Sequence, residues 1–295
     1  MARDDIAELV TWLASIRPPG DSGIAARRAH FEAIAAGCMP PAESLSPRPA
    51  RIGGVACEWT GPEDASGVIL HLHGGGFSVG SAATYRGLAQ RLAEVTGCRV
   101  LVPEYRLAPE HPFPEGLQDA LAVYDALLAS GVSARDITLS GDSAGGGLCL
   151  SLLGEIRSAG LPIPARCYLM SPWTDLTLGG DSLTRNADSD PIVSAASATA
   201  SVGRYLAGAV EADDPRVSPL FSDLSGHPPL LIQAGSAEAL LDDSVRLADR
   251  ARAAGVAVTI EVVPDMVHIF PYFHRRLAAG DAALVRAAGF IRGNG

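Results

Sequence analysis

Short apolar segments alternate with segments of helical periodicity through most of the chain, and this alternation constrains the fold more than any other feature. Segments of this kind, bounded by Gly, Pro and Asp, are typical of buried strands. Predicted strands are 67–72, 98–103, 136–140, 165–170, 229–234 and 256–263, with a half-exposed edge strand at 55–59. Predicted helices are 84–96, 115–129, 145–158, 241–254 and 275–292. Repeated strand–helix units predict an α/β protein with a mostly parallel sheet that is covered by helices on both faces.

The first fifty residues do not follow this alternation. Apolar residues recur at helical spacing over 5–16, and a second helical stretch covers 22–37. Residues 39–50 hold four prolines and are predicted to form an extended connector. The segment 1–50 is therefore predicted to be a small helical unit ahead of the main domain, 51–295.

A long interval also interrupts the alternation. Residues 172–225 separate two predicted strands by far more than a usual crossover. This interval is interpreted as an insertion that contains one or two helices. Long insertions beside a sheet often bind ligands, so 172–225 and the N-terminal helices are expected to form a cap together.

Composition excludes several classes of partner. The net charge of −10 and the lack of a Lys/Arg run argue against nucleic acid and anionic membrane surfaces. No apolar stretch is long enough for stable membrane insertion. The N-terminus, MARDDIAELV, lacks the features of a signal peptide, and a cytoplasmic protein is expected. The five cysteines are widely spaced without a CxxC pair, so no disulfide framework or zinc site is predicted.

The segment Gly141-Asp142-Ser143-Ala144-Gly145 matches the pattern GxSxG. The match alone is weak in a glycine-rich chain, but a predicted strand precedes it and a predicted helix follows it. Strand, sharp turn and helix are the setting of a nucleophile elbow, which presents a serine hydroxyl above the sheet. A plain turn or a phosphate-binding loop is the alternative, although the lysine of a nucleoside triphosphate loop is absent.

Three consecutive glycines, in HGGGF at 73–77, follow another predicted strand. Glycine loses the most backbone freedom on folding, so three in a row suggest that the backbone approaches something closely. Attack of Ser143 on an ester would create an oxyanion, and backbone amides of such a loop can stabilise it. A simple tight turn is the alternative.

Four ordered motifs carry a resemblance to a known family. They are HGGG at 73–76, YRLAPEHPFP at 105–114, GDSAGG at 141–146 and SPWTDL at 171–176. Together they resemble the bacterial hormone-sensitive-lipase-like esterases, a branch of the α/β-hydrolases, over residues 70–270. The resemblance implies an eight-stranded α/β-hydrolase fold, an N-terminal helical cap and no metal or organic cofactor. It also implies that Ser143 is the nucleophile and that His73 shapes the glycine loop.

The residues of the oxyanion hole also follow from the resemblance. It assigns this role to the backbone amides of Gly75, Gly76 and Ala144. These amides would donate hydrogen bonds to the negative oxygen of the reaction intermediate.

The order serine, acid, histidine along α/β-hydrolase chains leaves three candidates for the general base. His268 follows the strand 256–263 at its carboxyl end and matches the HxF placement of the family. His274 is expected to open the last helix as a surface residue, and His227 precedes a strand at the opposite end of the sheet. His268 is therefore favoured as the base.

The acid of the triad is sought after the strand 229–234. Aligning EALLD with the family pattern assigns this role to Glu238, where the family usually has Asp. Both acids are accepted in this architecture. Asp242 and Asp243 are the rivals, and their alternative role is to cap the helix that begins there.

Other residues are predicted to support the site. Asp142 is expected to point away from the nucleophile and to be structural, and Glu104, Arg106 and Glu110 are expected to brace loops. Five aromatic residues are candidates to line the substrate pocket, although each could instead be core packing: Phe77, Tyr85, Trp173, Tyr205 and Phe270.

The predicted function is a serine carboxylesterase that acts through an acyl-enzyme. The family resemblance implies that its substrates are short- to medium-chain acyl esters. A non-catalytic small-molecule receptor, a dehydratase-like lyase and a peptidase are the alternatives. The predicted edge strand at 256–263 is also a place where a second subunit could pair to form a homodimer.

Overall fold

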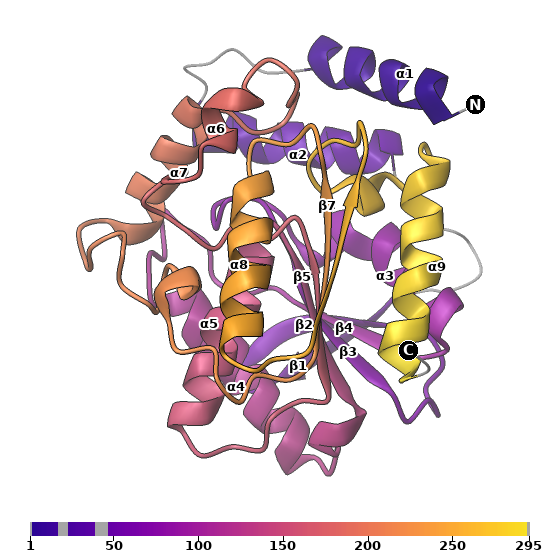
Figure 1. Cartoon of the computed structure of the whole chain (residues 1–295). Coiled ribbons are helices and arrows are strands. Elements are labelled where there is room, and N and C mark those ends of the chain that lie inside the picture. Colours follow the sequence, from indigo (N-terminus) through magenta and orange to yellow (C-terminus); the bar gives the residue numbers. More distant parts are fainter. Residues whose placement is uncertain (1, 17–22, 39–46, 294–295) are drawn as a thin grey trace.

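A twisted eight-stranded sheet forms the centre of the protein (Figure 1). The computed structural model describes residues 2–16, 23–38 and 47–293. The strand order is β1-β2-β4-β3-β5-β6-β7-β8. The pairs β1–β2 and β2–β4 are antiparallel, and all the other pairs are parallel. The strands are β1 Arg48–Ile52, β2 Val55–Thr60, β3 Val68–Leu72, β4 Arg99–Pro103, β5 Ile137–Asp142, β6 Arg166–Met170, β7 Leu230–Gly235 and β8 Val258–Val263.

Helices cover both faces of the sheet (Figure 1). The helices are α1 Ala2–Ser15, α2 Ile24–Cys38, α3 Ala82–Thr96, α4 Glu115–Ala129, α5 Ala144–Ser158, α6 Ser182–Arg185, α7 Ala195–Leu206, α8 Leu241–Ala253 and α9 Ala278–Arg292. One hydrophobic core includes residues of α4, α5 and α8, and the other includes residues of α3 and α9. Ile69 belongs to the second core and its neighbour Leu70 to the first, as the alternation of side chains along a strand requires. Apolar runs without polar alternation are therefore buried on both sides.

The position of β1 corrects the sequence-based prediction. The interval 39–50 was expected to be a connector, but a strand begins at Arg48, and β1 rather than β2 forms the edge. Residues of β1 alternate between partly buried and exposed, so the strand has no apolar run to reveal it. A hairpin joins β1 to β2 through Gly53 and Gly54, both with positive φ (57° and 82°), a turn that favours glycine. At the other edge, β8 ends the sheet as predicted.

The last helix also begins later than predicted. Helix α9 starts at Ala278, and a 3₁₀ turn, Phe270–Phe273, precedes it. His274 ends this turn and is buried, whereas it was expected on the surface at the start of the helix. Burial lowers the pKa of His274 to about 4. The 3₁₀ turn before it is buried because its apolar residues, including Phe270 and Phe273, pack in the second core.

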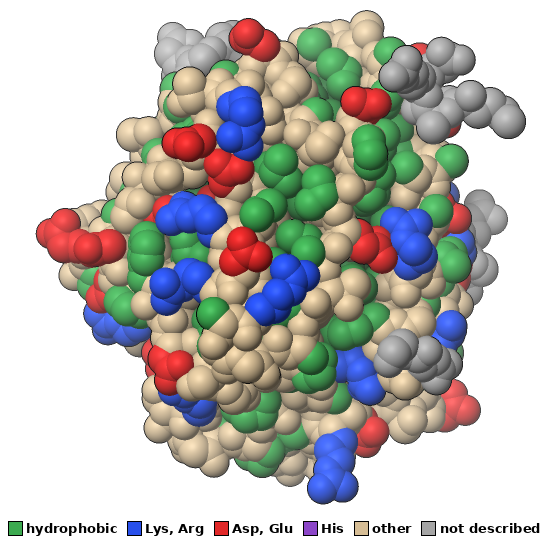
Figure 2. All heavy atoms as spheres, in the orientation of Figure 1, with side chains coloured by type: hydrophobic (Ala, Val, Ile, Leu, Met, Phe, Trp, Pro, Cys, Tyr) green, Lys and Arg blue, Asp and Glu red, His purple; other side chains and the backbone are tan. Residues whose placement is uncertain are grey.

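The helices α1, α2, α6 and α7 lie together at one end of the sheet (Figure 1). On the face drawn in Figure 2, acidic and basic side chains are interspersed, so basic residues form no continuous stripe there. None of the described helices is both long enough and apolar enough to cross a bilayer.

A sharp turn between β5 and α5 carries Ser143. Its backbone has φ 51° and ψ −124°, which L-residues rarely adopt. The N–H of Ser143 donates to the carbonyl of Met170 (2.9 Å), and its carbonyl accepts from the N–H of Trp173 (2.8 Å). A side chain at Gly145 would collide with the carbonyl oxygens of Leu72 and His73. The glycine after the serine is therefore required because α5 begins directly against the end of β3.

This contact predicts different effects for two glycines of the same helix. Gly145→Ala should lower the free energy of unfolding by about 2 kcal/mol or more, because α5 must move away from β3. Gly154→Ala is the control, since a Cβ there meets no atom within 4 Å. It should be neutral or stabilise the protein by up to about 1 kcal/mol. Urea unfolding of both variants checks this, and equal stability would contradict the packing argument.

Candidate active site

The hydroxyl of Ser143 lies at hydrogen-bond distance from His268. The two atoms, Ser143 Oγ and His268 Nε2, are 2.9 Å apart. Ser143 stands at the start of α5, and His268 lies in the loop after β8. The sheet brings these distant segments together because parallel strands end at the same edge. Both side chains are buried, at 8% and 1% exposure, so the pair is shielded from bulk water.

Glu238 lies on the other side of the histidine ring. Its Oε2 is 3.9 Å from His268 Nδ1, slightly longer than a hydrogen bond. The same oxygen accepts from the hydroxyl of Ser171 (2.6 Å) and the N–H of Gly235 (3.0 Å). Glu238 Oε1 and His268 Nδ1 are both buried and have no hydrogen-bond partner among the described residues. Approach of the two groups by about 1 Å would satisfy the histidine nitrogen.

The surroundings of His268 set its proton affinity. Complete burial acts to lower its pKa, because a charged ring loses its hydration. The carboxylate of Glu238 more than offsets this effect, with smaller contributions from Asp190 and Asp142, so the pKa of His268 is raised above its ordinary value. The site therefore favours the protonated ring more than water does.

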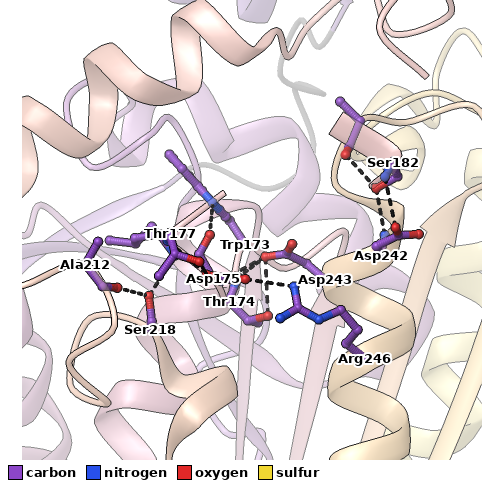
Figure 3. Close-up of polar contacts among 12 residues, drawn as sticks. Trp173, Thr174, Asp175, Thr177, Ser182, Ala212, Ser218, Asp242, Asp243 and Arg246 are labelled. Carbon is purple, nitrogen blue, oxygen red and sulfur yellow. Dashed lines mark hydrogen bonds and ion pairs between the residues drawn. The ribbon is translucent and has the colours of Figure 1, made fainter. Parts of the chain in front are cut away.

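Two carboxylates that compete with Glu238 for the role of acid serve other segments (Figure 3). Asp242 accepts from the N–H of Ser182 (2.9 Å) and from Arg185 (2.7 Å). Asp243 accepts from the N–H groups of Thr174 and Asp175 (2.7 and 2.9 Å). Neither forms an ion pair or hydrogen bond with His268 in the described chain. They hold the loops after β6 against α8, rather than capping α8 itself as considered from the sequence.

This loop attachment explains the SPWTDL motif. Asp243 is fully buried, and burial raises its pKa to about 7, although the two backbone N–H groups lower it. Asp175 pairs with Arg246 of α8 at 2.7 Å (Figure 3). The motif therefore fixes the segment after β6, whose Ser171 contacts Glu238 and also accepts from the N–H of Ile269 (2.9 Å).

The side chain of Asp142 holds the glycine loop, residues 73–77, from the side of the sheet. The N–H of Gly74 donates to Asp142 Oδ1 (3.0 Å), and the hydroxyl of Tyr85 donates to Asp142 Oδ2 (2.7 Å). The carboxyl group thus points to the loop, away from Ser143, as predicted. His73 Nδ1 is 2.8 Å from the carbonyl of Gly74, and burial lowers the pKa of His73 to about 4, so the ring is neutral and donates there. Tyr105 donates to the carbonyl of His73 (2.6 Å).

The residues expected to form the oxyanion hole lie around the serine. Gly75 and Gly76 line the same cavity as Ser143, with φ of 114° and 57°. In the hydrogen bonds found between described residues, neither amide N–H has an acceptor. Ala144 is the first residue of α5, where the N–H has no partner within the helix. The N-terminus of α5 adds a favourable potential for an anion.

A cavity of about 640 Å³ opens above this pair. Of the five aromatic residues predicted to line it, only Trp173 does so. Phe77 stacks on Tyr205 with ring centroids 3.8 Å apart. Tyr85 donates a hydrogen bond to Asp142, and Phe270 is buried in the core. These four aromatic residues are thus packing residues, because large flat side chains are most stable where they bury the most surface.

Helices α2 and α7 contribute ten of the residues that line the cavity. Lining residues from these helices are His30, Phe31, Ile34, Ala196, Ser197, Ala198, Ala200, Ser201 and Arg204, together with Arg27. The sequence prediction missed them because they belong to no motif. Only the position of their helices in the two irregular regions could have pointed to them.

The loop-bracing residues make the predicted kind of contacts. Glu104 accepts from the N–H of Ala82 at the start of α3 (2.9 Å). Arg106 pairs with Asp119 (2.7 Å), and Glu110 pairs with Arg28 of α2 (2.6 Å). Among the described residues, no group of three His, Cys, Asp or Glu side chains is arranged to hold a metal ion.

Comparison with known proteins gives a consistent relationship. A family model described as the alpha/beta hydrolase fold matches residues 69–272. An acetyl-hydrolase from Streptomyces hygroscopicus is 39% identical over 255 residues, which cover 86% of this chain and 83% of that protein. An esterase from Acinetobacter venetianus is 40% identical over 253 residues, with 85% and 84% covered.

Solved structures agree with the sequence matches. The crystal structure of an esterase from the bacterial hormone-sensitive lipase family superposes with a TM-score of 0.94 and 38% identity, over 98% of both chains. Relatives at this identity and coverage, together with the same fold over the whole length, share an ancestor and a reaction type with this chain. The chain therefore belongs to the α/β-hydrolase family and is a carboxylic ester hydrolase of the bacterial hormone-sensitive-lipase-like branch.

Proposed function

We propose that this protein is a serine carboxylesterase that cleaves short- to medium-chain acyl esters through the triad Ser143, Glu238 and His268. The observation that carries the proposal is the 2.9 Å contact between Ser143 Oγ and His268 Nε2 inside a cavity that also exposes Gly75 and Gly76. A nucleophile, a base and unpaired amide donors around one space are what acyl transfer requires.

The reaction begins with the serine. His268 Nε2 accepts the proton of Ser143 as Oγ attacks the ester carbonyl. The carbonyl oxygen becomes negative and receives hydrogen bonds from the amides of Gly75, Gly76 and Ala144. The tetrahedral intermediate collapses, His268 gives the proton to the leaving alcohol, and the acyl group stays on Ser143. Water, deprotonated by His268, then attacks the acyl-enzyme and releases the acid.

Glu238 has two roles in this scheme. Its carboxylate favours the tautomer with the proton on Nδ1, so that Nε2 is free to accept the serine proton. It also stabilises the imidazolium that forms when Ser143 is deprotonated. The 3.9 Å separation is expected to shorten in the substrate complex, since catalytic hydrogen bonds are often long in the free enzyme.

The cavity supports the substrate class. At about 640 Å³ it has the size of a site for a small molecule, and helices α2 and α7 cover it. We propose that residues 1–50 and 172–225 act as the cap that limits the length of the acyl chain, above a catalytic domain of residues 51–295.

Ser143→Ala should abolish ester hydrolysis. The variant loses the nucleophile, so kcat/KM for p-nitrophenyl esters should fall roughly 10⁴-fold or more. Ser151→Ala is the matched control, because Ser151 lies on the same helix outside the cavity. Rates are measured on a series from acetate to palmitate, and the highest kcat/KM is expected at short to medium chains. A folded wild type that cleaves no ester would contradict the proposal and favour a receptor or a lyase.

The pH profile should identify the acid. Because the free base is the active form of His268, kcat/KM should rise with pH, with a midpoint above the ordinary value of 6.5. Glu238→Gln removes the charge that raises this pKa while burial still lowers it, so the midpoint should move to lower pH. The variant should also lower kcat roughly a hundredfold or more, because the favoured tautomer is lost.

Two further variants complete this test. Glu238→Asp should keep a raised midpoint and part of the activity, since a carboxylate remains. Asp242→Asn should leave the midpoint unchanged, because Asp242 contacts Ser182 and Arg185 instead of the histidine. A shift of the midpoint in Asp242→Asn but not in Glu238→Gln would mean that Asp242 is the acid.

A further inference from the structure

The cavity above Ser143 has an unusual charge distribution for this protein. The chain as a whole has a net charge of −10. The described residues that line the cavity nevertheless include Arg27 and Arg204, together with His30 and His268, but no Asp or Glu. Two arginines and no carboxylate among the described lining residues of an acidic protein favour a ligand with negative charge.

Arg204 is the best-defined of these groups. It lies on α7 and is half-buried, and its Nε donates to the hydroxyl of Ser78 (3.3 Å) while its Nη2 donates to the hydroxyl of Ser201 (2.9 Å). These are its only hydrogen bonds to described residues, so three of its five N–H groups lack an acceptor among those residues. No described carboxylate pairs with it. A guanidinium group with an open edge of this kind matches the two oxygens of a carboxylate.

Arg28 is a nearby arginine whose role is structural, and its contacts differ from those of Arg204. Arg28 of α2 also contacts Ser78, through the carbonyl oxygen (3.0 Å), but it forms a two-bond ion pair with Glu110. Burial lowers the pKa of Arg204, and the positive charge of Arg27 lowers it further. Arg28 is thus neutralised within the protein, whereas the charge of Arg204 is partly desolvated and repelled. An anion in the cavity would relieve both costs.

The location of Arg204 relates this charge to the reacting centre. Ser201, which accepts from Arg204, has its Oγ 2.9 Å from the position that a Cβ on Gly76 would occupy. The guanidinium group is therefore on the side of the cavity next to the glycine loop. An ester held by this loop would have its acyl or alcohol part within the same space.

We propose that this esterase acts on esters that carry a carboxylate group in their acyl or alcohol part, and that Arg204 is the specificity-determining residue that binds it. This inference rests on the proposed esterase function. It goes beyond that function by assigning a charged substrate class and a role to a residue outside the catalytic motifs.

Matched ester pairs test the proposal. On the acyl side, mono-p-nitrophenyl adipate is compared with its uncharged analogue, in which an isopropyl group replaces the carboxylate. On the alcohol side, phenyl acetates with a carboxymethyl or an isobutyl substituent are compared. The quantity is the ratio of kcat/KM, charged over uncharged, after subtraction of spontaneous hydrolysis. The adipate chain is long enough that its carboxylate does not readily attack its own ester.

For at least one pair, the ratio in Arg204→Met should be roughly tenfold or more below that of the wild type, because a charge-assisted hydrogen bond is lost. Arg204→Lys should keep an intermediate ratio. Arg135→Met, an exposed residue outside the cavity, makes the same change in net charge and should keep the wild-type ratio. A partly misfolded variant lowers both rates of a pair and leaves their ratio unchanged.

The wild type alone provides a second measurement. The ratio of the sensitive pair should fall as NaCl is added, since salt screens the attraction. Equal ratios in wild type and Arg204→Met for both pairs, or a ratio that does not respond to salt, would overturn the inference while the uncharged esters still show esterase activity. Failure of the wild type to cleave any of the four esters would instead count against the proposed function.

Discussion

The buried carboxyl group of Asp142 joins the two halves of the catalytic apparatus. It ends β5 and precedes the strained serine, and it accepts from the N–H of Gly74 and the hydroxyl of Tyr85. Backbone strain of the kind seen at Ser143 persists only where the surroundings hold it firmly. Because Asp142 directly precedes Ser143 and its side chain accepts from the glycine loop, the position of the turn at Ser143 is coupled to that of the loop.

Ser171 has a comparable role for Glu238 and His268, the proposed acid and base. Its hydroxyl donates to Glu238, and it accepts from the N–H of Ile269, next to His268. Ser171 itself belongs to the segment that Asp243 and Arg246 fasten to α8 through Thr174 and Asp175. The loops after β6, β7 and β8 are thus one hydrogen-bonded unit.

The buried strands and the turn at Ser143 could be predicted well from the sequence, for physical reasons. Buried strands have continuous apolar runs, and Gly145 and Ser143 form a motif because backbone packing permits no other residue beside the turn. The strand β1 has no buried residue, and therefore no such pattern. The aromatic residues were assigned to the pocket by type, but Phe77 and Tyr205 are most stable stacked on each other in the core.

The cavity lining was less predictable because it depends on how α2 and α7 meet above the sheet. Any small or apolar residue can line a cavity, so such positions carry no motif. Arg204 could be recognised only once the structure showed that Arg28, on a neighbouring helix, has Glu110 as its partner, while the partners of Arg204 among the described residues are hydroxyl groups. The absence of a partner is a property of the fold rather than of the local sequence.

Helices α2 and α7 both contact Ser78, and in the proposed mechanism this contact would connect substrate selection to catalysis. This residue follows the glycine loop, and its carbonyl oxygen accepts from Arg28 while its hydroxyl accepts from Arg204. The glycine loop is therefore held from the sheet side by Asp142 and from the helix side by two arginines. Because binding energy from remote parts of a substrate can be used to position the reacting group, contacts made at Arg204 would act, in the proposed mechanism, on the loop that carries the Gly75 and Gly76 amides. Substitutions in α7 and in the loop share Ser78 as a partner, and their effects on catalysis should not be additive.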